Sequence, residues 1–314
     1  MTDTSKTIAL FGATGTIGRA TALALLNDGH TVTCFIREGR DAGVLPRAAA
    51  VRMVDFTAPH ELDGFDAVVS CLASRTGAPL DAWRVDHDMN IAILNAAKRA
   101  GVGHFVMLSA ICVQKPLLEF QRAKLAFEAA LSASGVTYSI VRPTAFFKSL
   151  SGQVRRVQNG KPFLLFGDGT LTACKPISDR DLGRYLARCL RDPALQNRIL
   201  PVGGPGDAIT ARTQGELIFK VLGMTPTFKS VPLKLMDLVI KGLSTGGLLV
   251  PALRRKAEFA KIGRYYASES MLIWDGQRYD ADATPSFGED TLEAHYRALV
   301  SGDVAADLGD HALF

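Results

Sequence analysis

The stretch Thr7–Gly18, TIALFGATGTIG, decides the fold. An apolar run, Thr7–Phe11, leads into a turn of the form G-x-x-G-x-x-G, and a helical pattern follows over Ile17–Leu26. Glycine permits the tight turn and lets the backbone approach a pyrophosphate, while the helix N-terminus offers free N–H groups to that anion. Glycine turns also occur for purely structural reasons, but a strand before the turn and a helix after it favour a dinucleotide site. The residues predicted to form this site are Gly12, Thr14, Gly15, Thr16, Ile17 and Gly18.

Strands and helices alternate along the following residues. Apolar strands are predicted at 31–36, 50–54, 67–72, 104–109, 138–141 and 199–202, and helices at 85–100 and 120–134. Such alternation indicates a parallel sheet with right-handed crossovers, and the nearly continuous apolar strands indicate that helices cover both faces. We therefore predict an α/β fold with a doubly wound, Rossmann-type parallel sheet. Residues 1–202 are expected to form the NADP-binding domain, and 203–314 a smaller C-terminal region on the substrate side, packed on it and interleaved with it.

Composition limits the classes of function. The chain has 314 residues, of which 47% are hydrophobic and 21% charged, and its net charge is +5. That small excess argues against a dedicated nucleic-acid binder but suits an anionic ligand. The five cysteines are far apart, so neither a disulfide framework nor a metal site is expected. A short polar start and the lack of a long apolar run predict a cytoplasmic protein without a signal peptide or membrane span.

The end of the second strand indicates which cofactor is bound. An acidic residue there would bond the ribose hydroxyls of NAD, but this chain has Arg37, whose planar fork suits the additional phosphate of NADP. The alternative is a solvated surface arginine. Two further segments are expected against the cofactor, the first near the adenine and the second under the dinucleotide: Asp55 and Phe56, and then Cys71, Leu72, Ala73 and Ser74.

One catalytic position departs from the usual pattern of short-chain reductases. Those that act on carbonyls place a serine after the fifth strand and a Tyr-x-x-x-Lys motif on the next helix, where the tyrosine gives a proton to the oxygen. This chain has Ser109 and Lys124, but Phe120 replaces the tyrosine. A phenyl ring cannot protonate an oxyanion. Two interpretations remain: a redox-silent NADP-binding regulator, or a reductase of a conjugated C=C bond, which develops no oxyanion.

Long strings in the chain resemble one family. The run Leu108–Lys124, LSAICVQKPLLEFQRAK, resembles the NADPH-dependent divinyl chlorophyllide 8-vinyl reductases, which are atypical short-chain dehydrogenases/reductases related to NmrA-like and isoflavone-reductase-like proteins. The resemblance extends from about Ile8 to Leu299. Further matching strings are CLASRTG at 71–77, YSIVRPTAFFKSL at 138–150, FGDG at 166–169, ACKPIS at 173–178, GGPG at 203–206 and IGRYYA at 262–267.

The resemblance implies an oxidoreductase of chlorophyll or bacteriochlorophyll biosynthesis, and hence of photosynthesis. It would use NADPH to reduce the 8-vinyl group of divinyl chlorophyllide, or protochlorophyllide, to ethyl. Lys124 is then expected to bond the nicotinamide ribose and to act in catalysis, with Ser109, Pro143 and Thr144 also at the cofactor. The residues expected at the substrate are Cys112, Lys115, Phe120, Phe146 and Phe147. For the three phenylalanines core packing is the alternative, and for Lys124 a solvated position.

The segment Val231–Lys256 mixes large apolar residues with lysines and arginines. It would fit an amphipathic lid over the substrate, or transient contact with the surface of a photosynthetic membrane. The competing functions are an NADP-sensing regulator and a reductase of another conjugated small molecule, such as the phenylpropanoid-like substrates of isoflavone-reductase relatives.

Overall fold

The computed structural model describes residues 5–56, 61–247 and 250–303. Its centre is a seven-stranded, wholly parallel sheet in the order β3-β2-β1-β4-β5-β6-β9. This order confirms the doubly wound Rossmann-type fold. The strands are β1 (Thr7–Phe11), β2 (Thr31–Arg37), β3 (Ala50–Val54), β4 (Ala67–Ser70), β5 (His104–Leu108), β6 (Thr137–Pro143) and β9 (Arg198–Val202).

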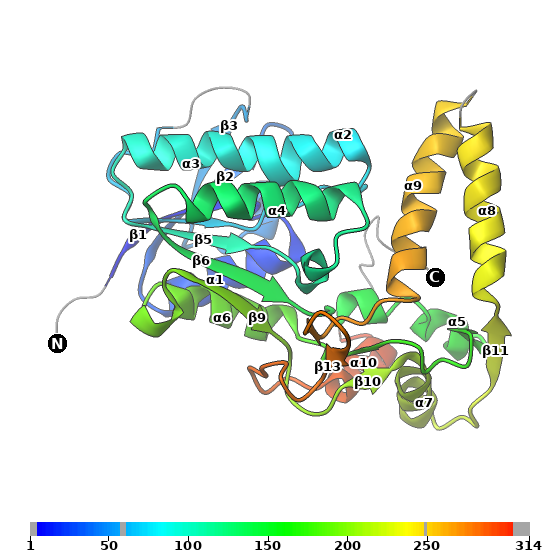
Figure 1. Ribbon diagram of the computed structural model, residues 1–314. Coiled ribbons are helices and arrows are strands. Elements are labelled where there is room, and N and C mark those ends of the chain that lie inside the picture. Colours follow the sequence, from blue (N-terminus) through cyan, green and yellow to red (C-terminus); the bar gives the residue numbers. More distant parts are fainter. Residues whose placement is uncertain (1–4, 57–60, 248–249, 304–314) are drawn as a thin grey trace.

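Helices cover both faces of this sheet, as the apolar strands require. On one face α1 (Thr16–Asn27) and α6 (Asp179–Cys189) pack against alternate strand residues, and on the other α3 (Met89–Arg99) and α4 (Glu119–Ser132) do so. Figure 1 shows α3 and α4 above the sheet and α1 and α6 below it. The carboxyl ends of the strands, where ligands bind in such sheets, lie toward the second lobe.

The helix predicted at 85–100 differs from the observed one. It begins earlier, with α2 (Pro79–Ala82), continues through a π-helical turn, η2 (Trp83–Asp88), and ends with α3. Pro79 occupies the first turn, where its missing N–H costs nothing. The π turn carries an additional residue, so the 3.6-residue periodicity visible in α3 does not extend back to residue 79.

A second lobe is built from segments on both sides of residue 202. β7 (Phe163–Phe166) pairs with β11 (Phe228–Val231), and β8 (Ala173–Cys174) pairs with β10 (Ile209–Thr210). The lobe has its own apolar core, and strands from both predicted regions take part in it. A division into two domains at residue 202 therefore stays a prediction. Its remaining elements are α5 (Val154–Gln158), α7 (Ala211–Leu222), α10 (Leu292–Ser301) and a small hairpin of β12 (Ile273–Trp274) and β13 (Tyr279–Asp280).

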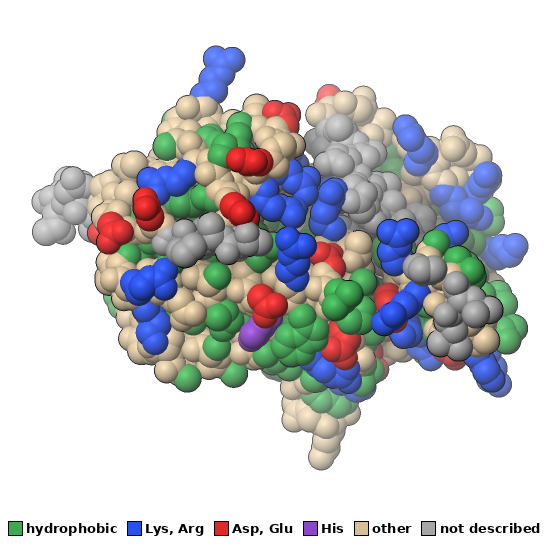
Figure 2. All heavy atoms as spheres, turned by 90° about the horizontal axis from the view of Figure 1, so that it is seen from above, with side chains coloured by type: hydrophobic (Ala, Val, Ile, Leu, Met, Phe, Trp, Pro, Cys, Tyr) green, Lys and Arg blue, Asp and Glu red, His purple; other side chains and the backbone are tan. Residues whose placement is uncertain are grey.

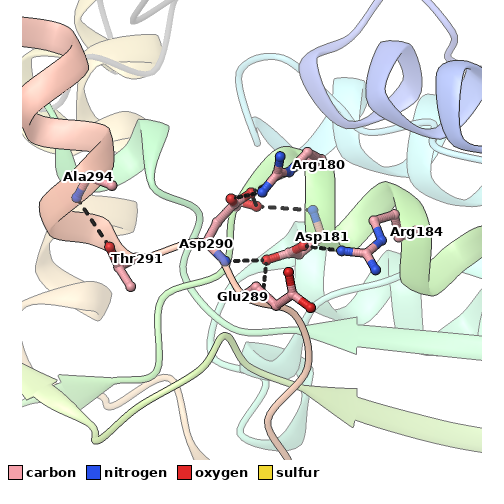
Figure 3. A network of polar contacts seen from close by, with 8 residues as sticks. Arg180, Asp181, Arg184, Glu289, Asp290, Thr291 and Ala294 are labelled. Carbon is pink, nitrogen blue, oxygen red and sulfur yellow. Dashed lines mark hydrogen bonds and ion pairs between the residues drawn. The ribbon is translucent and has the colours of Figure 1, made fainter.

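A polar network ties the C-terminal segment to α6 (Figure 3). The buried carboxylate of Asp181 accepts the backbone N–H groups of Glu289 and Asp290, each at 2.9 Å. Asp290 in turn accepts hydrogen bonds from Ser178 and Arg180. These contacts join the segment just before the last helix of the second lobe to α6 of the sheet domain.

Two helices stand apart from this body. α8 (Leu233–Gly246) and α9 (Pro251–Tyr266) form an antiparallel pair that projects at the right of Figure 1. The carboxyl end of α9 reaches back to the sheet domain, where the Tyr265 hydroxyl donates to the carbonyl oxygen of Cys112 at 2.9 Å. None of the helices in the described part of the chain is long and apolar enough to cross a membrane.

Candidate active site

The glycine-rich turn after β1 is shaped by close backbone contacts. Gly12 has a φ of +75°, and a Cβ there would lie 2.6 Å from the carbonyl carbon of Cys71. A Cβ on Gly18 would lie 2.2 Å from the carbonyl oxygen of Gly12. Gly15 caps α1 without a side-chain hydrogen bond, and the first turn of the helix has no acidic residue. The turn therefore offers bare backbone N–H groups and a helix N-terminus, which fit the pyrophosphate of a dinucleotide.

A lysine that the sequence analysis missed also reaches this turn. Lys148 follows β6, and its ammonium donates to the hydroxyl of Thr16 at 3.0 Å. The contact places a positive charge at the N-terminus of α1, where a pyrophosphate would lie. No local pattern predicts it, because 132 residues separate the two side chains.

The arginine predicted to select NADP is part of a cluster. Arg37 is exposed at the end of β2. Its pKa is lowered, first by partial burial and then by the positive charges of Arg40, Arg75 and Arg84, with Asp81 acting in the opposite direction. Arginines that repel one another favour binding of a phosphate dianion among them. Only Arg37 was predicted from the sequence: Arg40 follows it in the same turn, whereas Arg75 and Arg84 come from a later loop and helix.

The remaining residues predicted at the cofactor divide into exposed and buried groups. Asp55 is exposed after β3, whereas Phe56 is buried with its ring edge on Phe11, 6.0 Å between centroids. Ala73 is exposed and Leu72 half-buried. Cys71 instead belongs to the core, and burial raises the pKa of its thiol to about 12. Cys71 therefore supplies backbone rather than a reactive sulfur to this edge of the sheet.

Lys124 does not stand free in solvent. Its ammonium lies 2.9 Å from a carboxylate oxygen of Asp86, and the two side chains are 7% and 0% exposed. Asp86 comes from the π turn η2, and it also accepts the backbone N–H of Ser74 at 3.4 Å. The ammonium has three N–H donors, more than the single contact with Asp86 uses; contact of Lys124 with the cofactor stays a prediction. The pair thus orients Lys124 and links the helix of the lysine to the loop that follows β4.

Ser109 has a partner inside the protein. Its hydroxyl donates to Glu128, which forms an ion pair with Arg142 at the end of β6. The serine is 4% exposed. Because Glu128 holds its proton, Ser109 connects the ends of β5 and β6. Contact of the Ser109 hydroxyl with the cofactor stays a prediction. The same is true of Pro143 and Thr144, which are buried at the end of β6.

The residues predicted at the substrate do not all meet. Cys112 is buried in η3 (Ile111–Gln114), with its sulfur 3.7 Å from the hydroxyl of Tyr266. Phe120 lies near Gly77, where a Cβ would be 3.7 Å from the phenyl ring and 2.5 Å from Ile262 of α9. These contacts bring together the loop after β4, the start of α4 and the end of α9. The sequence analysis did not identify Tyr266, since α9 lies about 150 residues from η3.

The side chains of the other three candidates make different contacts. Lys115 pairs with Glu269 at 2.8 Å, and its ammonium lies over the Trp274 ring, 4.8 Å from the centroid. Phe147 is 3% exposed in the core of the second lobe, which favours core packing over a place in a substrate wall. Phe146 is half-buried and forms a bridge with Ile177. Their contacts with substrate stay predictions.

Comparison with known proteins gives three results. A family model described as NAD(P)H-binding matches residues 12–193. The chain is 47% identical to the chloroplastic divinyl chlorophyllide a 8-vinyl-reductase of Zea mays, covering 98% of this chain and 83% of that protein, and 46% identical to that of Arabidopsis thaliana, covering 96% and 79%. The structure of an NADPH-dependent quinone oxidoreductase from Escherichia coli, solved with NADPH, superposes on this chain with a TM-score of 0.67. The match covers 93% of this chain and 99% of that one at 18% identity, so the two proteins share a fold. The chain therefore belongs to the divinyl chlorophyllide a 8-vinyl-reductase family of NAD(P)H-binding proteins.

Proposed function

We propose that this protein uses NADPH to reduce the 8-vinyl group of a divinyl chlorophyllide, or protochlorophyllide, to an ethyl group. The observation that carries the proposal is the site of Lys124. Asp86 orients the buried Lys124 side chain, and Phe120 holds the sequence position from which short-chain reductases protonate a carbonyl oxygen. The 46–47% identity to plant proteins of that name supports the same substrate class.

Each part of the site has a task in this reaction. The cofactor supplies a hydride when it is bound. The turn at Gly12 and the N-terminus of α1 hold its pyrophosphate, and the arginines around Arg37 hold the additional phosphate. Lys124, fixed by Asp86, donates to the ribose hydroxyls beside the nicotinamide ring. Phe120 offers an apolar ring to a flat macrocycle, and the conjugated substrate spreads the negative charge that hydride addition leaves, so no oxyanion acid is required.

Anaerobic incubation of the purified protein with NADPH and divinyl chlorophyllide tests the reaction. Chromatography should show a monovinyl product that requires NADPH. Suppose that NADPH binds but that neither divinyl chlorophyllide nor divinyl protochlorophyllide is reduced. The substrate assignment is then wrong, and the protein is an NADP-binding regulator or a reductase of another conjugated molecule.

The arginine cluster gives a prediction about cofactor choice. Arg37→Ala is expected to weaken NADPH binding by about 10- to 100-fold, since hydrogen bonds to charged groups contribute ~1.5–3 kcal/mol. NADH lacks the additional phosphate, so its affinity should change little. Titration of protein fluorescence with each cofactor measures both constants. Arg47→Ala removes an exposed arginine from the neighbouring loop and serves as the matched control; equal losses for NADH and NADPH in Arg37→Ala would contradict the assignment.

We also propose that the α8–α9 pair contacts an anionic membrane surface. One face of α8 carries Leu235, Leu238 and Val239, whose exposed fractions are 50%, 67% and 48%. The structure describes every residue of α8, and none of them is buried. Residues 229–264 hold eight Lys or Arg and two Asp or Glu, which gives a net charge of +6. The whole chain has a net charge of +5, so the rest of the chain carries a net charge of −1. Figure 2 shows Lys and Arg side chains among hydrophobic ones at the right, where these helices lie. An apolar stripe within a cationic surface complements anionic lipid.

Flotation with vesicles containing phosphatidylglycerol tests this contact. Replacing Arg254, Arg255 and Lys256 by Glu should weaken binding by at least about 100-fold, because each basic residue near an anionic surface contributes ~1 kcal/mol. High salt should release the unchanged protein. Lys98→Glu with Arg99→Glu alters exposed charges at the end of α3 and is the control. Binding that neither salt nor the triple change reduces would contradict the proposal.

A further inference from the structure

A tyrosine hydroxyl at the end of α9 contacts the segment that follows β5. Tyr266 ends α9, and its oxygen lies 3.7 Å from the sulfur of Cys112 in η3. The side chain is only half-buried, so it still borders space open to a ligand. Tyr265 beside it fixes the position of the helix, because its hydroxyl donates to the carbonyl oxygens of Cys112 and Lys115 at 2.9 and 3.2 Å.

The same face of α9 borders Phe120. Ile262 lies one helical turn before Tyr266, so both side chains project from one face. Ile262 packs against the loop after β4 at Gly77, within reach of the Phe120 ring. One face of α9 therefore meets the segment after β5 through Tyr266 and the loop beside Phe120 through Ile262.

A second observation indicates that this space receives a polar or reacting group. Gln121, next to Phe120, is 0% exposed, and its side-chain oxygen accepts the N–H groups of Leu117 and Leu118 at 2.8 and 2.9 Å. Its side-chain nitrogen makes no hydrogen bond of full geometry among the described residues, although it lies close enough to the Cys112 thiol and the Tyr265 hydroxyl to lower both pKa values. A buried donor that is bonded so weakly is a place where a ligand or water can complete the bonding. Gln121 also acts on Cys112. Burial raises the pKa of the Cys112 thiol, and Tyr266, Gln121 and Lys124 each offset part of that rise.

We infer that Tyr266 gives the proton that completes vinyl reduction; this inference rests on the proposed function. Hydride addition to the terminal vinyl carbon leaves an electron pair on the inner carbon, delocalised into the macrocycle. The O–H bond of Tyr266 then breaks, its proton bonds to the inner carbon, and the electron pair of that bond stays on the phenolate oxygen. The phenolate takes a proton from water, and the ethyl product has gained one hydride and one proton.

The protonation state of Tyr266 suits this task. Burial raises the pKa of its hydroxyl well above the ordinary value for tyrosine, with the proximity of Cys112 acting in the same direction. The phenol is therefore protonated at every working pH. The product carbon is a far weaker acid than any phenol, so transfer to it stays favourable.

The variant Tyr266→Phe tests the inference with three readouts. Turnover should fall by about 100-fold, the lower end of the range for a general acid. The solvent deuterium isotope effect on turnover should rise, because protonation by water becomes the slow step. Chlorophyllide affinity, measured from the shift of its Soret band, should stay close to that of the unchanged protein.

Tyr296→Phe is the matched control. It removes a tyrosine hydroxyl that donates to the carbonyl oxygen of Leu150 in the core of the second lobe, so it should lower stability without altering the isotope effect. Turnover of Tyr266→Phe at the unchanged rate, or a loss that chlorophyllide binding fully explains, would overturn the inference. If the unchanged protein itself makes no monovinyl product, the proposed function fails instead.

Discussion

Lys124→Ala is expected to abolish turnover and to destabilise the fold by about 3–5 kcal/mol, because it leaves a buried carboxylate without its partner. Asp86 is fully buried, and its described side-chain partners are the Lys124 ammonium at 2.9 Å and the more distant N–H of Ser74 at 3.4 Å. The activity should fall for a second reason, because we propose that the lysine also holds the ribose of the cofactor. Thermal unfolding and single-turnover assays measure the two effects separately.

A paired variant separates stability from catalysis. Asp86→Asn combined with Lys124→Met removes both charges and keeps similar volumes, so most of the lost stability should return while turnover stays absent. Recovery of turnover in the double variant would show that the lysine serves only to neutralise Asp86. Full stability in Lys124→Ala would show that the buried pair is absent in solution.

Gly18→Ala is expected to destroy NADPH binding. A Cβ at this position would lie 2.2 Å from the carbonyl oxygen of Gly12, and the opposing group is backbone that cannot rotate away. Relieving the clash must displace the start of α1 or the turn that we propose holds the pyrophosphate, and overpacking of this kind also costs ~1–3 kcal/mol of stability. Equilibrium binding of NADPH, together with thermal unfolding, measures both losses.

Gly242→Ala provides the comparison. Gly242 lies within α8, where a Cβ would have nothing within 4 Å, so the change should raise stability slightly and leave NADPH binding intact. If Gly18→Ala bound NADPH as tightly as Gly242→Ala does, the close-packed cradle would not be the cofactor site.

The sheet domain could be predicted because its signals are local. β1 and β3 have the predicted bounds, and α1 extends only one residue beyond the predicted helix at each end. Each of these elements is marked by its own apolar run, with a glycine turn between β1 and α1. The helix predicted at 85–100 was wrong at its start, because the π turn that carries Asp86 interrupts the periodicity on which the prediction depended.

The site could be predicted only where one segment carries a recognisable motif. Lys124 follows from its spacing to Phe120 within α4, but its partner Asp86 comes from another helix, and no sequence pattern links the two. The same holds for Arg84 beside Arg37 and for Tyr266 beside Cys112. Such pairs depend on how the α/β layers and α9 pack together, which a single sequence does not encode in any local window.

The central claim is that a hydride passes directly from NADPH to the vinyl group. NADPH carrying deuterium at the transferable C4 position of its nicotinamide ring tests it most directly. We predict that mass spectrometry will find one deuterium in the 8-ethyl group of the monovinyl product, on its terminal carbon. A monovinyl product without deuterium, from cofactor labelled on either face, would contradict the claim.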